Sequence, residues 1–368
     1  MKHFSLIILA VILFSCANKP KDLPVLDLAA TINKQSPDTF TWNSIAEHIS
    51  YTSIETRPDA LLSQSVYISY IGDDSYCLVD NSMGSIFLTD KNGSIISSLA
   101  RRGRGPGEYT NIAYVHVDES DSTIQVFDIT GANKHIVYDL TGNLIKETSL
   151  TDRVIGFPIR MTKNYFVMRG NMHKTTDYKV YITDKDLNVG KGLFPLGPVS
   201  SGFERMVLLN QFSANINQDM AIVNFAQQDT VFSITDQGAA PLFILNKGAY
   251  RLPEESGKSF QDPSVPYIQN VSLAILPKHY LIRYMLSGTL FDEVWGRADN
   301  RLVARFSIEN GEAGYPLVLP SGKTIRVPQS SVSGNTVGLL VPAYQLVGEI
   351  EGIREDDNPV IVVVDLKK

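Results

Sequence analysis

Short apolar runs alternate with turn-forming residues along most of the chain, which predicts short β-strands joined by tight turns. In the first unit the expected strands are residues 65–71, 75–80, 85–89 and 94–99. The last turn contains Asn92-Gly93, a pair that tolerates positive φ at both central positions of a hairpin. Four strands in close succession predict one complete antiparallel sheet.

The unit recurs at a regular spacing. Turn aspartates stand at positions 90, 139, 184 and 236, which are 49, 45 and 52 residues apart. A period in this range, with four strands in each unit, is typical of a β-propeller. The chain after its N-terminal segment holds about six such periods. We therefore expect an all-β fold: a six-bladed β-propeller with four-stranded antiparallel blades.

The later blades are less regular. The fifth is expected from strands at 271–276, 280–286, 290–295 and 302–308, and the last from 336–341 and 359–365. Residues 343–354 have helical spacing and are expected to form a helix on the outside. The strand at 49–56 lacks a local partner, so we expect it to pair with the C-terminal sheet near 360–366 and to close the ring.

The N-terminus has the features of an export signal. Lys2 and His3 precede the apolar run 4–14, which is too short to cross a bilayer, since a membrane-spanning helix needs about 20 residues. The run ends in Leu13-Phe14-Ser15-Cys16, which resembles a bacterial lipobox. We expect residues 1–16 to form a lipoprotein signal peptide ending at Cys16, the lipidated residue. Residues 17–44 would be a tether and lead-in, and residues 45–368 a single propeller domain.

These features predict a location in the bacterial cell envelope, with the protein attached to a membrane through its N-terminal lipid alone. Ala17-Asn18-Lys19 lacks the acidic run that resembles surface-export signals, which favours the periplasmic side and leaves surface exposure open.

Composition excludes several classes of function. The formal net charge of −6 provides no basic surface for duplex DNA or RNA, so no nucleic-acid partner is expected. Two cysteines cannot build a disulfide framework, nor a zinc site on their own. With Cys16 lipidated, Cys77 is left in the apolar run 76–79, where we expect a buried core residue.

Catalytic motifs are not apparent, and no cofactor is predicted. The six histidines are scattered singly, so a metal site would have to be assembled in three dimensions. Gly322-Lys323-Thr324 ends like a phosphate-binding loop, but position 317 is Leu where that motif needs glycine, and we interpret Ser321-Gly322-Lys323 as a hairpin turn. The spacing of Asp184, Asp186 and Asn188 resembles that of a calcium-binding loop, but the glycine and glutamate of an EF-hand are missing. We interpret this segment as a turn between strands.

The segment 101–109 is the most distinctive in the chain. It places Arg101, Arg102 and Arg104 among three glycines, followed by Glu108 and Tyr109. Glycine lets backbone N–H groups approach a ligand, and guanidinium groups suit carboxylate, sulfate or phosphate. One interpretation is therefore an anion-binding or ligand-binding loop at a mouth of the ring. The other is a structural crossover between blades, with its arginines paired to Glu108, Asp118 or Glu119, or hydrogen-bonded to neighbouring backbone carbonyls.

The sequence Gly103-Arg104-Gly105-Pro106-Gly107-Glu108-Tyr109 resembles a hallmark of six-bladed β-propeller lipoproteins of the Bacteroidetes type. The pattern at 45–56 and the ending at 355–360 resemble the same family, so the likeness covers nearly the whole chain after the signal. Residues 103–138 are also similar to an NHL repeat, within a TolB-like propeller. The resemblance implies the fold and an envelope location. It implies no established activity, because the family is largely uncharacterised.

Two functions from different classes follow. The first is a non-enzymatic envelope binding or scaffold module that presents a propeller face to a glycan, a peptide or a partner protein. The alternative is a metal-dependent lactonase- or lyase-like enzyme with a site on the ring axis, an idea supported by analogy of fold alone.

Overall fold

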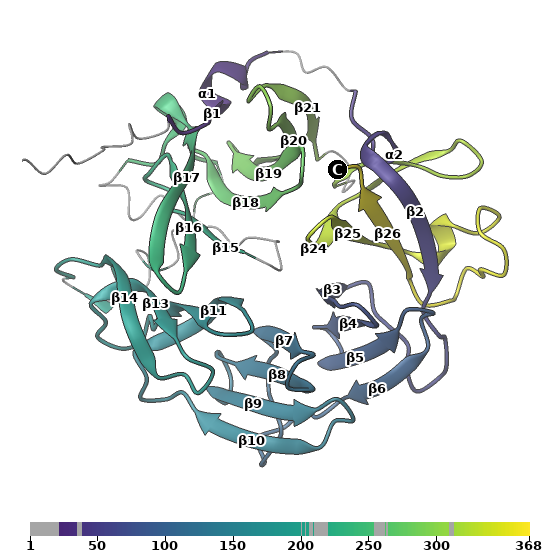
Figure 1. The fold of residues 1–368 in the computed structure, drawn as a ribbon, viewed down its shortest axis with the longest axis horizontal. Helices are drawn as coiled ribbons and strands as arrows, with labels where there is room; N and C mark the ends of the chain where they lie inside the picture. Colours follow the sequence, from purple (N-terminus) through teal and green to yellow (C-terminus); the bar gives the residue numbers. More distant parts are fainter. Residues whose placement is uncertain are drawn as a thin grey trace, which may run out of the picture.

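Six four-stranded β-sheets surround a central axis as the blades of a β-propeller (Figure 1). The computed structural model describes residues 22–34, 39–199, 201, 202, 204, 205, 209, 220–253, 262, 264–308 and 313–368. Cys16 and the expected signal peptide lie outside the described residues. Among the described residues, no helix is long and apolar enough to cross a membrane.

The first three blades follow the chain from the axis to the rim, and all their strands are antiparallel. Blade 1 consists of β3 (Val66–Ile71), β4 (Ser75–Asp80), β5 (Ser85–Asp90) and β6 (Ile95–Leu99). Blade 2 consists of β7 (Tyr114–Asp118), β8 (Thr123–Asp128), β9 (Lys134–Asp139) and β10 (Leu144–Ser149). Blade 3 consists of β11 (Ile155–Met161), β12 (Phe166–Gly170), β13 (Tyr178–Thr183) and β14 (Val189–Pro195).

Two of the remaining three blades take a strand from the N-terminal part of the chain. Blade 4 contains β15 (Ala221–Asn224), β16 (Thr230–Thr235), β17 (Gly238–Asn246) and β1 (Val25–Asp27). Blade 5 contains β18 (Gln269–Ile275), β19 (His279–Leu286), β20 (Thr289–Gly296) and β21 (Leu302–Ser307). Blade 6 contains β24 (Gln329–Ser333), β25 (Thr336–Val341), β26 (Val360–Leu366) and β2 (Ala46–Ser53).

The elements outside the blades whose bounds are fully described are short. They are the hairpin of β22 (Tyr315–Val318) and β23 (Thr324–Val327), the helices α1 (Leu28–Thr31) and α2 (Trp42–Ile45), and the 3₁₀ turns η1 (Gly248–Tyr250) and η3 (Ala343–Gln345). The hairpin turn contains Ser321-Gly322-Lys323, as predicted, and Gly322 has φ 90°. The Asp184 turn likewise joins β13 to β14.

Strand β1 departs from the predicted pattern, because it lies in the stretch expected to be a tether and lead-in. It pairs parallel with β17, at the outer edge of an otherwise antiparallel sheet. Parallel pairing is possible because the strand arrives from elsewhere in the chain instead of through a tight turn. Leu26 is fully buried there and accounts for the attachment.

Strand β2 pairs antiparallel with β26, and Ile49 lies opposite Val364. The predicted partner segments are therefore neighbours, although the strand begins and ends three residues earlier than expected. The exit of β2 is held to the C-terminal segment by Asn358. Its side-chain amide donates to the carbonyls of Glu55 and Ala60, at 2.8 Å in each case, and accepts from the Leu62 N–H at 2.8 Å.

The helix expected at 343–354 is not present, and this prediction was wrong. Only the 3₁₀ turn η3 forms, followed by further turns. Gly348 and Gly352 adopt φ values of 78° and 82°, which are left-handed and interrupt an α-helix. The apolar side chains of Leu346 and Ile353 are still buried, so the spacing reflects packing of a folded loop.

The core is divided among the interfaces between blades. Each of the six apolar clusters found in the described residues joins two neighbouring blades, and one of them joins blade 6 to blade 1 through Ile361 and Ile68. Cys77 is fully buried between blades 1 and 2, as predicted, and burial raises the pKa of its thiol to about 12.

Candidate functional site

The glycine-rich loop, defined as residues 101–109, lies in the connection from β6 at the rim of blade 1 to β7 at the axis of blade 2. Its two ends are tied together by backbone hydrogen bonds. The Gly103 N–H donates to the Tyr109 carbonyl at 2.9 Å, and the Tyr109 N–H donates to the Arg101 carbonyl at 3.0 Å. The loop is thus closed on itself.

The side chains of Glu108 and Tyr109 form hydrogen bonds with backbone groups of the loop and of neighbouring segments. Glu108 Oε2 accepts from the Gly105 N–H at 2.8 Å. Tyr109 is fully buried, with its hydroxyl 2.8 Å from the Leu99 carbonyl oxygen and 3.1 Å from that of Gly84. Burial raises the pKa of Tyr109 to about 12, so the phenol remains a neutral donor. Tyr109 has no surface left for a ligand.

The three arginines of the loop are exposed. Arg101 donates to the Gly142 carbonyl at 2.9 Å, and its guanidinium lies 5.7 Å from the centre of the Tyr138 ring. Within the described part of the chain, Arg102 and Arg104 form no ion pair. Arg101 thus makes the backbone-carbonyl contact that the crossover interpretation allows, whereas the carboxylate pairing it also allows is not seen for these arginines among the described residues.

Blade 2 holds the loop through other groups. Lys134 Nζ donates to the Gly105 carbonyl at 2.9 Å and forms an ion pair with Glu147 at 3.0 Å. Glu147 Oε2 also accepts from the Gly107 N–H at 2.7 Å. Asp128, at the end of β8, accepts from the Thr110 N–H just beyond the loop at 2.6 Å. These contacts are made by the backbone of the loop and of Thr110. They do not involve the guanidinium groups of Arg102 and Arg104.

A cavity of about 420 Å³ lies between blades 2 and 3, and we call it the Phe157 pocket. It opens on the same face of the ring as the glycine-rich loop. The connections into the innermost strands and the turns between second and third strands all lie on that face. Its lining comes from four separate segments: Ile129, Thr130, Asn133, Thr151, Gly156, Phe157, Arg169, Gly170, Asn171, Met172, His173 and Lys174.

Local backbone features of blade 3 leave room for the pocket. The pairing of β11 with β12 is irregular on both sides of Pro158, so the strand bulges next to Phe157. A side chain at Gly170 would come within 2.7 Å of the Tyr178 carbonyl oxygen, so only glycine fits there. Asn171 then fixes the turn, because its amide donates to the Arg153 carbonyl at 2.9 Å and its Oδ1 accepts from the His173 N–H at 2.9 Å.

The Phe157 pocket is cationic. The Arg169 guanidinium lies over the Phe157 ring, 4.6 Å from its centre, and donates to the Leu209 carbonyl at 3.4 Å. Burial lowers the pKa of Arg169 to about 10, which still leaves the group charged at neutral pH. Lys174 pairs with the exposed Asp152 at 3.1 Å. Among the described residues that line the pocket, none is an aspartate or a glutamate.

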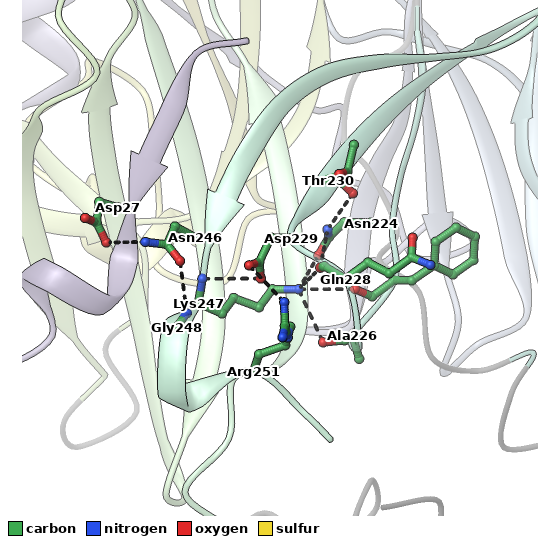
Figure 2. A network of polar contacts seen from close by, with 11 residues as sticks. Asp27, Asn224, Ala226, Gln228, Asp229, Thr230, Asn246, Lys247, Gly248 and Arg251 are labelled. Atoms are coloured by element: carbon green, nitrogen blue, oxygen red, sulfur yellow. Dashed lines mark hydrogen bonds and ion pairs between the residues drawn. The ribbon is translucent and has the colours of Figure 1, made fainter. Parts of the chain in front are cut away.

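A buried lysine in blade 4 was not singled out by the sequence. Lys247 follows β17 and is fully buried (Figure 2). Its Nζ lies 2.9 Å from Asn224 Oδ1, 2.7 Å from the Gln228 carbonyl oxygen and 3.2 Å from that of Phe225. Burial lowers the pKa of Lys247 to about 7. The amine joins the turn after β15 to the end of β17, and its contacts leave no face for a substrate.

Sequence reasoning did not identify the Phe157 pocket. Its residues follow no motif and are spread from Ile129 to Lys174, so only the packing of two blades brings them together. In the described ranges, no group of three or more His, Cys, Asp or Glu side chains is placed to hold a metal ion.

A family described as "Domain of unknown function (DUF4934)" matches residues 23–365. A Bacteroides fragilis protein, named as a candidate exported protein, has a similar structure with a TM-score of 0.65 and 14% sequence identity; the match covers 94% of this chain and 100% of that one. A DUF4221 family member from Bacteroides vulgatus has a TM-score of 0.49 and 11% identity, over 88% and 97% of the two chains. No curated protein matches this chain. Because the family match spans nearly the whole propeller, the chain belongs to the DUF4934 family.

Proposed function

We propose that this protein is an exported, lipid-anchored binding protein that takes a small acidic ligand, such as an acidic sugar, in the Phe157 pocket. The export signal and the lipobox-like Cys16 support the location. The similar structure from Bacteroides fragilis supports it too, since that protein is named as a candidate exported protein. The periplasmic side is favoured because Ala17-Asn18-Lys19 lacks the acidic run that resembles surface-export signals.

The observation that carries the binding function is the Arg169 guanidinium stacked on the Phe157 ring in the wall of a pocket that Lys174 also lines. Its volume of about 420 Å³ falls within the range of about 300–1,000 Å³ that is usual for small-molecule sites. A guanidinium stacked on an aromatic ring is held flat, which suits a carboxylate or sulfate whose oxygens accept from two parallel N–H groups. Thr130, Asn133 and Thr151 add polar side chains that suit the hydroxyl groups of a sugar.

The enzymatic alternative, a metal-dependent lactonase- or lyase-like protein with an axial site, requires a set of metal ligands. The described residues contain no group of three or more His, Cys, Asp or Glu placed to hold a metal ion, so no observation favours it as a second function. A peptide carboxylate or an acidic partner protein would meet the same guanidinium, and both belong in the test.

Calorimetric titration of the mature protein with uronic-acid and sulfated oligosaccharides, and with neutral sugars of the same size, tests the proposal. We expect acidic sugars to bind at least tenfold more tightly than neutral ones, and less tightly as salt increases. Arg169→Gln should abolish this preference, whereas Arg104→Gln, on the same face, should retain it. Equal binding of acidic and neutral sugars, or full binding by Arg169→Gln, would contradict the proposal. Acidic peptides provide the arm that distinguishes the ligand class.

A further inference from the structure

The N-terminal segment is built into the rim of the ring where blades 4 and 5 meet. Val25 pairs with Ile244 in the parallel ladder of β1 and β17, and the Ile244 N–H donates to the Pro24 carbonyl at 2.8 Å. Leu26 and Leu28 are fully buried in the apolar cluster between the two blades. A chain with two buried leucines is not free to swing away from the propeller.

Polar contacts hold the same segment on both sides. On blade 4, the Asn246 amide donates to Asp27 Oδ1 at 2.9 Å (Figure 2). On blade 5, Arg305 Nη1 donates to the Thr31 carbonyl at 2.7 Å and to the Ile32 carbonyl at 3.1 Å. Arg305 is itself fixed by the fully buried Glu293, whose Oε1 is 2.6 Å from its Nε. The segment is therefore attached from Pro24 to Ile32.

This attachment limits how far a lipid on Cys16 can lie from the ring. Six residues lead from Cys16 to Asp22, the first described residue, and such a length of chain spans at most about 22 Å. A free tether over the whole stretch from 17 to 44 would have reached several times farther and would have allowed any orientation. Strand β1 shortens the tether because it joins the sheet at Val25.

We propose that the bilayer surface docks against the rim formed by β1 and α1, so that the propeller stands on the edge of blades 4 and 5. This orientation rests on the proposed lipid anchor at Cys16. Figure 1 shows β1 and α1 on the side of the ring opposite β6, so the rim of blade 1 points away from the membrane. Neither face of the ring is pressed against lipid, and the Phe157 pocket stays open to a dissolved ligand.

Depth-dependent fluorescence quenching tests this orientation. Val25 on β1 and Ile96 on β6 are exposed apolar residues on outermost strands, with 46% and 56% of their surfaces accessible. Each is replaced by cysteine in the lipidated protein and labelled with the same fluorophore; Cys77 is fully buried and does not react in the folded state. The labelled proteins are bound to phosphatidylcholine vesicles that contain a lipid with a nitroxide headgroup.

We expect the label at Val25→Cys to be quenched at least threefold more strongly than the label at Ile96→Cys. An insertion of twenty Gly/Ser residues after Lys21 should remove the difference, because it lengthens the tether without changing the fold. Equal quenching of the two labels in vesicle-bound protein without the insertion overturns the orientation alone. Failure of the protein to bind vesicles, while Cys16→Ala behaves identically, overturns the lipid anchor and the orientation with it.

Discussion

The connection that enters blade 2 and the connection that enters blade 3 run along the same face of the ring, but they differ in what they leave open. The first contains the glycine-rich loop, whose backbone groups are bound by Lys134 and Glu147, and Asp128 holds Thr110 directly after it. The second is held by Asn171, whose side-chain amide donates to the Arg153 carbonyl, and it borders the Phe157 pocket. Glycines and arginines in a loop therefore do not by themselves make a site, because here the backbone of the loop is occupied by its own contacts.

The largest effect is expected from emptying the interior of the glycine-rich loop. Tyr109→Ala should lower the free energy of unfolding by about 3–5 kcal/mol, because it opens a cavity under the loop and leaves the Leu99 and Gly84 carbonyls without their donor. Urea unfolding measures the loss, with Tyr344→Ala as the control, since Tyr344 is exposed. If Tyr109 formed a ligand site instead, the variant would keep its stability and lose affinity for acidic sugars.

Much of the fold could be predicted because blades are local structures. The strands of blade 1 and the four turn aspartates follow from alternation and turn residues that lie within a few positions of one another. Asp90 shows why the turn signal is strong, since its Oδ1 accepts from the N–H groups of Asn92 and Ser94, at 2.9 Å in each case. Strand β1 gives no such signal, because its partner β17 is more than two hundred residues away.

The candidate site could not be predicted for a related reason. Three polar residues near the ends of second strands, Asp80, Asp128 and Asn171, each hold the connection that enters their own blade. Nothing in the local sequence distinguishes Asp128, which supports a filled loop, from Asn171, which supports the edge of a cavity. The difference arises where blade 2 meets blade 3, through the bulge beside Pro158 and the missing side chain at Gly170.

The next effect tests how the connection into blade 2 is held. Asp128→Asn should cost about 2–3 kcal/mol at pH 7, because hydrogen bonds to a charged acceptor are worth more than those to an amide. Burial opposes ionisation of this fully buried carboxyl, but hydrogen bonds from Thr110, Ala132 and Asn111 outweigh it and lower the pKa of Asp128 below its ordinary value.

The pH dependence of Asp128→Asn provides the check. A carboxyl whose pKa is lowered by folding contributes stability that is present above its unfolded pKa, about 3.9, and that is lost as the pH falls through the folded value. The difference between wild type and variant in urea unfolding should therefore shrink below pH 4. A difference that stays constant from pH 7 to pH 3 would show that the charge of Asp128 is not what holds the connection.

A smaller effect is expected from a substitution in the Phe157 pocket, and it should be an effect on ligand affinity. Phe157→Leu keeps an apolar side chain but removes the ring under the Arg169 guanidinium, a contact worth about 1 kcal/mol, or roughly a fivefold change in affinity. Titration with the acidic sugar that binds wild type measures the change, and the melting temperature controls for folding. Unchanged affinity would mean that the guanidinium does not depend on the ring for its position.

The smallest effect should come from the most conspicuous residues in the sequence. Arg102→Gln combined with Arg104→Gln should change the free energy of unfolding by less than about 0.5 kcal/mol, because both side chains are exposed and form no ion pair among the described residues. Lys134 holds this part of the loop through the carbonyl oxygen of Gly105, which the substitutions leave in place. Affinity for acidic sugars should also stay within experimental error of wild type, measured by the same titration. A tenfold loss of affinity without a change in the free energy of unfolding would contradict this expectation. It would place the anion site on the glycine-rich loop and not in the Phe157 pocket.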